Sequence, residues 1–264
     1  MKINNDKYYT PSDLARKLII KTLKFIGPKN VTDVVEPSAG NGAFSHHFKD
    51  CKAYDIEPEA PDIIRQDFLT LKLPYQKGRL VIGNPPFGNS NHLSRKFYKK
   101  AIELGDYIAF IQPISQLKNN LQMYQFDLVY SEDLGVVKYS DRELHCCFNI
   151  YKRPENGKLN EQPDFTLKDI TIREFRRKGN YTIPEGYDYG MCNWGNGSLG
   201  KKTSYVGEFA QEVYFYCHKK EFLPKMLELL EFNTIRDYVK SISMKRISVA
   251  RLYKYLGENI EGIQ

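Results

Sequence analysis

The most informative stretch of the sequence is Leu80-Val81-Ile82-Gly83-Asn84-Pro85-Pro86-Phe87-Gly88. Its apolar start is typical of a buried strand. The two prolines end that strand, because proline has a fixed φ and no N–H to donate to a neighbouring strand. Asn84 to Phe87 should therefore form a stiff loop at the carboxyl end of a strand, which is where open α/β sheets bind ligands.

This loop carries the groups needed to hold an exocyclic amine such as that of adenine. The lone pair of that amine is delocalised into the ring, which makes it a poor nucleophile. Two acceptors that bind its two hydrogens favour the tetrahedral geometry of methyl transfer. The Asn84 side-chain oxygen is one such acceptor, and the Pro85 carbonyl is a candidate for the other. Phe87 would then offer a flat face on which a base can stack.

A second motif begins where a predicted strand, 31–35, runs into Glu36-Pro37-Ser38-Ala39-Gly40-Asn41-Gly42-Ala43-Phe44. Gly40 and Gly42 allow a ligand to approach the backbone without Cβ interference. A helix is expected from about Ala43 to Phe48. The loop lacks the Lys-Ser/Thr pair of a Walker A motif and the three-glycine dinucleotide spacing, so a nicotinamide cofactor is disfavoured.

Acidic residues follow at the ends of the next predicted strands. Asp55 ends a short strand after the glycine loop, which is the position of a carboxylate that binds ribose hydroxyls. Asp55 is the first choice for this role and Glu57 the second. Asp67 ends the following strand, where it could accept from an adenine amine while Phe68 packs on the ring.

Strands and helices alternate along the first 150 residues. Thr10 or Ser12 can cap an N-terminal helix that Gly27-Pro28 ends, and a second amphipathic helix fits 92–104. Further strands are expected at 107–111, 127–130, 136–139 and 146–151. This alternation predicts an α/β fold with a doubly wound, mostly parallel sheet.

The sequence changes character after residue 154, which predicts a first domain over 1–154 and a smaller region over 155–264. A strand is expected at 209–216, helical structure at 222–240, and a last helix at 249–256 between Ser248 and Gly257. Basic and aromatic residues are interleaved here, which suits nucleic-acid contact but also a small mixed α/β domain with solvated charges. The candidates for contact are Arg176, Arg177, Lys178, Trp194, Lys201, Lys202, Lys245 and Arg246.

Composition is that of a globular protein, with 41% hydrophobic and 27% charged residues. No run reaches the 18 or so apolar residues of a membrane span and the N-terminus does not resemble a signal peptide, so a cytoplasmic location without membrane attachment is expected. The net charge of +7 weakly favours a polyanionic partner. The five cysteines include no Cys-x-x-Cys pair, and neighbours in His145-Cys146-Cys147 would point to opposite faces of a strand, so no metal site is predicted.

Taken together, these motifs resemble the S-adenosylmethionine-dependent DNA adenine-N6 methyltransferases of the gamma class. The resemblance covers about residues 8–152 and rests on Thr10-Pro11, the Glu36-Pro-x-x-Gly-x-Gly loop, Asp55, Asp67-Phe68 and Asn84-Pro85-Pro86-Phe87. It implies a seven-stranded, Rossmann-like class I methyltransferase sheet followed by a smaller, mixed α/β target-recognition region.

The resemblance also implies roles for single residues. Asn84 and Pro85, with Pro86 and Phe87, would form the catalytic loop. Phe87 would stack on a flipped adenine, and Phe148 could pack on the other side of that base. The residues implied to bind S-adenosylmethionine are Tyr9, Thr10, Pro11, Glu36, Ser38, Gly40, Gly42, Asp55, Ile56, Asp67, Phe68 and Asn84.

The implied activity is methylation of adenine N6 in double-stranded DNA, at a short specific sequence, as in restriction–modification systems or in orphan and phage methylases. No metal is required. The short recognition region leaves room for a homodimer or an accessory specificity subunit. Three alternatives stay open: an RNA base-amine methyltransferase, a protein-glutamine methyltransferase, and a DNA-binding or interaction protein that has kept the fold without turnover.

Overall fold

The computed structural model describes residues 9–139, 143–179, 181–195, 197–241 and 245–264. The chain divides into two compact units, residues 1–162 and 163–264. The division falls in a segment without helix or strand that follows the last strand of the first unit. Each unit has its own hydrophobic core and is described separately below.

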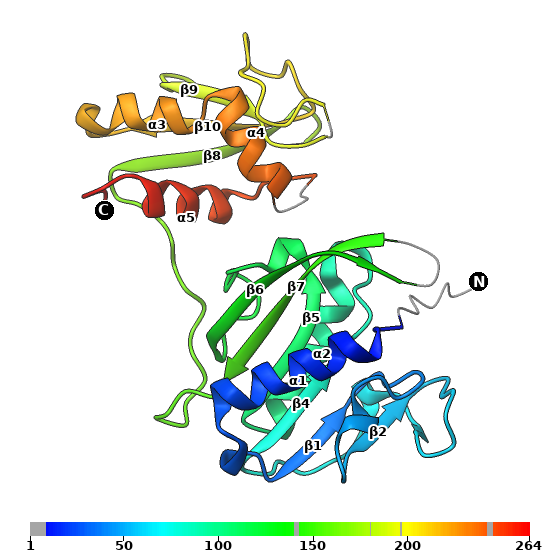
Figure 1. The fold of residues 1–264 in the computed structure, drawn as a ribbon. Helices are drawn as coiled ribbons and strands as arrows, with labels where there is room; N and C mark the ends of the chain where they lie inside the picture. The colour runs from blue at the N-terminus through cyan, green and yellow to red at the C-terminus, as the bar shows by residue number, and fades with distance from the viewer. Residues whose placement is uncertain (1–8, 140–142, 180, 196, 242–244) are drawn as a thin grey trace. The chain divides into compact units, whose positions relative to one another are not determined.

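The first unit is built on a seven-stranded sheet with the order β3-β2-β1-β4-β5-β7-β6 (Figure 1). Neighbouring strands from β3 to β5 are parallel, whereas β7 is antiparallel to both β5 and β6. This order confirms the doubly wound, mostly parallel sheet of the Rossmann-like class I methyltransferase fold. The strands are β1 (Asp33–Glu36), β2 (Lys52–Asp55), β3 (Ile64–Arg65), β4 (Arg79–Gly83), β5 (Tyr107–Pro113), β6 (Asp127–Lys138) and β7 (Glu143–Lys152).

Two helices cover opposite faces of this sheet. The apolar stripe of α1 (Ser12–Ile26) packs in one core cluster with Leu80, Ile82 and Ile111. The stripe of α2 (His92–Leu104) packs in another with Val81 and Phe110. Alternate residues of β4 and β5 thus enter different clusters, because successive side chains of a strand point to opposite faces. Burial on both faces explains why these strands are continuously apolar.

Several local expectations for this unit need correction. The bounds of α2 agree with the sequence, but neither Thr10 nor Ser12 caps α1, whose first flanking residue is Pro11. A 3₁₀ turn at Ser45–His47 replaces the helix expected from Ala43 to Phe48. The two strands expected at 127–130 and 136–139 are one strand, β6, with irregular pairing near Val129 and Leu134.

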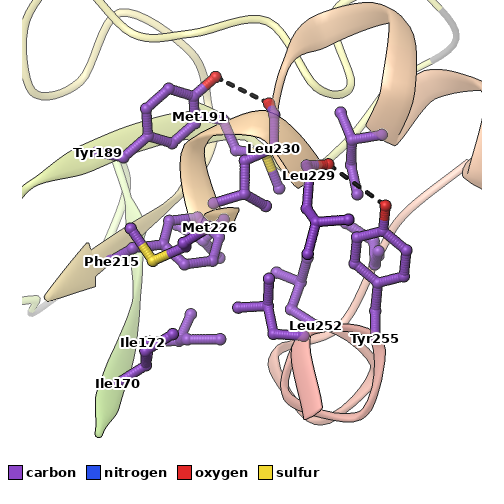
Figure 2. Close-up of a cluster of buried hydrophobic side chains, with 14 of the residues drawn as sticks. Ile170, Ile172, Tyr189, Met191, Phe215, Met226, Leu229, Leu230, Leu252 and Tyr255 are labelled. Carbon is purple, nitrogen blue, oxygen red and sulfur yellow. Dashed lines mark hydrogen bonds between the residues drawn. The ribbon is translucent and has the colours of Figure 1, made fainter. Parts of the chain in front are cut away.

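The second unit is a three-stranded antiparallel sheet, ordered β8-β10-β9, with three helices. Its strands are β8 (Ile170–Arg176), β9 (Tyr189–Cys192) and β10 (Gln211–Cys217), and its helices are α3 (Leu223–Leu229), α4 (Phe232–Ser241) and α5 (Val249–Asn259). Ile172 of β8, Phe215 of β10 and Leu252 of α5 lie in one core cluster (Figure 2). The hydroxyl groups of two tyrosines hydrogen-bond backbone carbonyls at the C-terminal end of α3. Tyr189 donates to the carbonyl of Leu230 and Tyr255 to that of Leu229.

The sequence predicted this unit less well. It missed β8 and β9, and the helical stretch at 222–240 is broken into α3 and α4 around Leu230. Ser248 does cap α5, accepting from the N–H of Arg251. The helix continues through Gly257 to Asn259, so the prediction that Gly257 ends it was wrong.

Candidate functional site

A cavity of about 300 Å³ lies at the carboxyl ends of β1, β2 and β4 in the first unit. Its volume is that of a small-molecule site. Many of its lining residues come from the loops that follow these strands. The lining includes Glu36 and Asp55, the last residues of β1 and β2. The loops contribute Pro37, Ser38, Ala39, Gly40, Asn41, Ala43 and Phe44 after β1, Ile56, Glu57 and Glu59 after β2, and Asn84 and Pro86 after β4.

The backbone of Gly40 ties the glycine loop to the end of β2 and to the loop that follows it. Gly40 donates its N–H to Asp55 Oδ2 at 2.8 Å, and its carbonyl accepts from the N–H of Glu59 at 2.9 Å. The φ of Gly40 is +54°, and that of Gly42 is +85°. A Cβ on Gly42 would lie 2.4 Å from the His46 ring. Gly42 therefore allows the loop to turn, although it does not itself line the cavity.

Glu36 is a buried carboxyl group at the base of this loop, with 1% of its surface exposed. It accepts from the backbone N–H of Ser45 at 2.7 Å and of Phe44 at 3.4 Å. Burial raises the pKa of Glu36 to about 8, and these hydrogen bonds only partly oppose that rise. Glu36 thus fixes the end of the loop and lines the cavity with a group that titrates near neutral pH.

Asp55 also lines the cavity, at the end of β2. Its second carboxylate oxygen accepts from the N–H of Glu57 at 2.8 Å. Each carboxylate oxygen has more than one lone-pair site, so these bonds orient Asp55 without using up its capacity to accept. Ile56 and Glu57 line the cavity beside it.

Asp67 and Phe68 reach the cavity from the segment after β3. Asp67 caps a 3₁₀ turn by accepting from the N–H of Leu69. The Phe68 ring stacks on Phe97 of α2, with ring centroids 5.4 Å apart. Phe97 itself lines the cavity. This place in the cavity was not expected for Phe97, because its position in the apolar stripe of α2 predicted a core residue.

The charge of the cavity is one-sided. Five carboxyl-bearing residues line it, namely Glu36, Asp55, Glu57, Glu59 and Asp67, and none of its lining residues in the described chain is Lys, Arg or His. Of the five, Glu36 adds little negative charge at neutral pH, because burial raises its pKa to about 8. Glu59 was not among the predicted site residues, since nothing in its local sequence distinguished it from a solvated acid. A cavity lined in this way suits a ligand with a positive charge and hydroxyl groups, and it disfavours phosphates.

The loop after β4 is tied to two other segments through Asn84. The Asn84 carbonyl accepts from Ser38 Oγ at 3.3 Å, and the Asn84 side-chain nitrogen donates to Thr10 Oγ1 at 3.2 Å. Asn84 and Pro86 line the cavity, whereas the adjacent Pro85 is buried and is not a lining residue. The structure thus brings the Asn-Pro-Pro-Phe motif to the same cavity as the glycine loop.

The segment before α1 covers part of this site. Tyr9 and Thr10 line the cavity, and the Tyr9 hydroxyl donates to Glu59 Oε1. A Cβ on Gly40 would lie 3.6 Å from the Tyr9 ring, so Tyr9 lies against the glycine loop. Pro11 instead directly precedes α1, and its carbonyl accepts from the N–H of Ala15. Pro11 does not line the cavity.

Two aromatic residues expected to contact a base lie elsewhere. Phe148 of β7 is fully buried, and Phe87 is 7% exposed, both within the core cluster that includes α1. Neither lines the cavity. Hydrophobic packing against α1 and the sheet accounts for their burial, and in this structure neither ring offers a face to the cavity.

The residues predicted to contact nucleic acid are dispersed over the second unit. Arg177 donates to the backbone carbonyls of Gly207 and Glu208, and Lys202 lies over the Tyr189 ring. Lys178 and Lys201 are exposed. The other four lie close in the fold: Trp194 pairs with Arg246, Arg246 follows Lys245, and Arg246 and Arg176 both bind Glu174.

Two other kinds of feature are absent from the described residues. No group of three or more His, Cys, Asp or Glu residues in that part of the chain is arranged to hold a metal ion. Likewise, no described helix combines the length and the apolar character needed to cross a membrane. His145 hydrogen-bonds Asp133 of β6, and Cys147 donates to the Pro113 carbonyl of β5, so both side chains contact neighbouring strands of the sheet.

No family model matches the chain, and no curated protein matches it either. Among solved structures, it is similar to a Pyrococcus horikoshii protein provisionally named an RNA methyltransferase, with a TM-score of 0.47 and 18% identity, over 58% of this chain and 89% of that one. The chain is also similar to the 23S rRNA methyltransferase ErmE, with a TM-score of 0.40 and 14% sequence identity, over 56% of this chain and 70% of that one. A third similar structure is magnesium protoporphyrin IX methyltransferase from Synechocystis PCC 6803, solved with bound SAM. Its TM-score is 0.40 and its sequence identity 12%, over 53% of this chain and 80% of that one.

Proposed function

We propose that the chain transfers a methyl group from S-adenosylmethionine to the N6 amine of an adenine in DNA. One observation carries this proposal: the Asn-Pro-Pro-Phe loop and the acid-rich glycine-loop cavity meet at Asn84. A ligand site and an amine-binding loop are thereby adjacent. The order of the motifs along the chain and the basic, aromatic texture of the second unit favour DNA as the substrate.

The cavity fits S-adenosylmethionine on chemical grounds. The acidic residues Asp55, Glu57, Glu59 and Asp67, with no cationic residue among those lining the cavity, favour a cationic adenosine derivative without phosphates over ATP or a dinucleotide. Asp55 would accept from the ribose hydroxyls, Asp67 from the adenine amine, and Ile56 and Phe68 would pack on the adenine ring. Glu36, Gly40 and Tyr9 would surround the amino-acid end. When bound, the cofactor supplies a methyl group activated by the positive sulfonium.

The role of Asn84 follows from how its loop is held. Ser38 fixes its backbone carbonyl, and Thr10 accepts from its side-chain nitrogen, which sets the orientation of the amide. We infer that the side-chain oxygen then serves as one acceptor for the target amine and the Pro85 carbonyl as the other, although the Pro85 residue does not itself line the cavity. Because both prolines restrict the loop, the acceptors need little reorganisation, and positioning supplies most of the rate.

A target adenine must leave the double helix before it can reach this loop, at a cost of a few kcal/mol. Stacking on an aromatic ring would recover on the order of 1–3 kcal/mol. With Phe87 and Phe148 both buried, this stacking role is not assigned to either ring.

The experiment that tests the proposal is label transfer from tritiated S-adenosylmethionine to DNA, RNA and protein in parallel. We expect label in DNA, released as N6-methyladenine on nucleoside analysis. Label in RNA or on protein glutamine would favour one of the alternatives, and cofactor binding without transfer to any acceptor would favour a non-catalytic protein.

A further inference from the structure

A cluster of exposed aromatic and basic side chains lies at one end of the sheet of the second unit. β8 ends there at Arg176, β9 at Cys192, and β10 begins there at Gln211, which pairs with Arg176. The cluster consists of Trp194, Arg246, Glu174, Arg176 and Tyr181, called the aromatic–arginine strip below.

Side-chain contacts connect the strip from one end to the other. Trp194 and Arg246 form an antiparallel bridge, so their side chains project to the same side. Arg246 binds Glu174 Oε1 at 2.5 Å, and Arg176 approaches Glu174 Oε2 at 3.4 Å. The Arg176 guanidinium in turn lies 5.9 Å from the centre of the Tyr181 ring.

The rings at both ends of the strip are accessible. Trp194 is 51% exposed, Tyr181 is 39% exposed, and the two arginine side chains between them are partly exposed. Tyr181 also contacts Phe175 edge to face, with centroids 6.5 Å apart, which braces its ring. Large aromatic side chains held partly in solvent beside arginines are typical of surfaces on which bases stack.

The backbone beneath Trp194 is well supported. Asn193 is fully buried and donates to Glu174 Oε1 at 3.2 Å and to the Ile247 carbonyl at 3.3 Å. Gly195 donates to the Lys245 carbonyl, and Ile247 to that of Asn193. The strip is therefore built on two paired segments rather than on a single loop.

The charge of the strip is positive, because two arginines share one carboxylate and Lys245 lies beside Arg246. Burial alone would raise the pKa of Glu174, but hydrogen bonds from Arg246 and Asn193 and the charges of both arginines lower it. Glu174 stays ionised, holds the guanidinium groups in place and leaves a net attraction for phosphate.

We propose that the aromatic–arginine strip binds an unpaired strand of nucleic acid, with bases stacked on Trp194 and Tyr181 and phosphates near Arg176 and Arg246. A duplex keeps the faces of its bases inside the stack, so flat side chains at the surface suit unpaired bases better. The choice of a nucleic acid as partner rests on the proposed function. Binding is measured without S-adenosylmethionine, so failure of the strip is distinguishable from failure of methyl transfer.

The sole tryptophan of the chain lies in the strip, which allows a direct test with the full-length protein. Short single-stranded DNA, single-stranded RNA and duplex DNA are titrated while tryptophan emission is recorded. We expect emission to fall on binding of a single strand of DNA, RNA or both, with weaker quenching by the duplex. An unchanged emission at saturation, or tighter binding of the duplex, would overturn the proposal.

Single substitutions distinguish base stacking on Trp194 from a general loss of affinity for nucleic acid. With a labelled single strand, Trp194→Ala should weaken binding by about 5- to 150-fold, whereas Trp194→Phe should keep most of the affinity. Tyr205→Ala, at another exposed aromatic of this unit, and Lys225→Ala, at an exposed lysine of α3, are the matched controls. Equal losses in Trp194→Ala and Tyr205→Ala would contradict a specific site.

Glu174→Gln gives a prediction of opposite sign. Removing this negative charge should tighten binding and steepen its dependence on salt, since each additional phosphate contact adds about 0.7 to the slope for a single strand. A purely structural Glu174 predicts weaker binding and a lower melting temperature instead, and that result would overturn the proposal.

Discussion

The Asn84 side-chain nitrogen donates to Thr10 Oγ1 at 3.2 Å, across 74 residues of sequence. This bond joins the loop after β4 to the segment before α1. Both residues line the same cavity. The orientation of the Asn84 amide, on which the proposed chemistry depends, is thus fixed from outside its own loop.

Removing the Thr10 hydroxyl tests this relationship. Thr10→Val keeps the volume of a buried side chain but leaves the Asn84 amide without this acceptor. We expect about a tenfold loss in the rate of methyl transfer, because losing one buried hydrogen-bond partner costs about 1–3 kcal/mol. Ser12→Ala, which removes a hydroxyl that contacts His47 outside the cavity, is the control and should retain the wild-type rate. Equal rates in all three proteins would show that the Thr10 bond has no catalytic role.

Asn84→Ala should separate catalysis from cofactor binding. We expect the single-turnover rate to fall by at least about 100-fold, as for the removal of one preorganised hydrogen-bonding group in other active sites. The dissociation constant of S-adenosylmethionine, measured by calorimetry, should change only slightly. Asn89→Ala, at an exposed position of the same loop, should keep the wild-type rate. Turnover retained in Asn84→Ala would count against the assigned role.

Burial of Glu36 predicts a dependence of stability on pH. The pKa of Glu36 is about 8 in the folded chain, against an ordinary value of 4.5. Between these values the unfolded chain releases the proton and the folded chain keeps it, so this group lowers the free energy of unfolding as pH rises from about 4.5 to about 8. The full effect is of order 5 kcal/mol.

Glu36→Gln should remove this dependence, because glutamine does not titrate. Urea unfolding of both proteins at pH 5 and pH 8, without cofactor, measures the difference. We expect the variant to lose less stability than the wild type over this range. Parallel losses in the two proteins would mean that Glu36 is already ionised in the folded state.

Phe148 distinguishes a core role from a base-stacking role. Phe148→Leu should lower the free energy of unfolding by about 1 kcal/mol or more, since it leaves space in a close-packed cluster. KM for DNA should stay unchanged. Phe68→Leu is the counterpart, because Phe68 lines the cavity and its substitution should weaken cofactor binding. A raised KM for DNA in Phe148→Leu at unchanged stability would restore the stacking role.

Much of the first unit could be predicted from sequence, because its strands are short apolar runs that end in Gly, Pro or acidic residues. That pattern placed Glu36, Asp55, Asp67 and Asn84 at strand ends, and the parallel sheet brings them to one cavity. The burial of Phe87 and Phe148 in the hydrophobic core could not be predicted from the sequence. A hydrophobic side chain beside a site can face either the core or the cavity, and only tertiary packing decides.

The second unit was harder to predict from the sequence, because its hydrophobic pattern changes within single helices and strands. In β8, Ile170 and Ile172 belong to the core cluster shared with the helices, but Glu174 and Arg176 on the same face of the strand are charged. Glu174 there forms ion pairs with Arg176 and Arg246. The apolar alternation therefore stops halfway along the strand, and the sequence missed it. At Gly257 the sequence predicted the end of a helix, because glycine commonly follows the last helical residue, but α5 continues through it.

The role proposed for Asn84 is to present the N6 amine of adenine to a bound methyl donor. Sequencing DNA for modified adenines, after expression in a host without its own adenine methylation, examines this role in the cell. We predict N6-methyladenine at one short sequence in cells that express the wild-type chain and none in cells that express Asn84→Ala. Unmodified DNA from cells with folded wild-type protein, or the same marks with Asn84→Ala, would contradict the account.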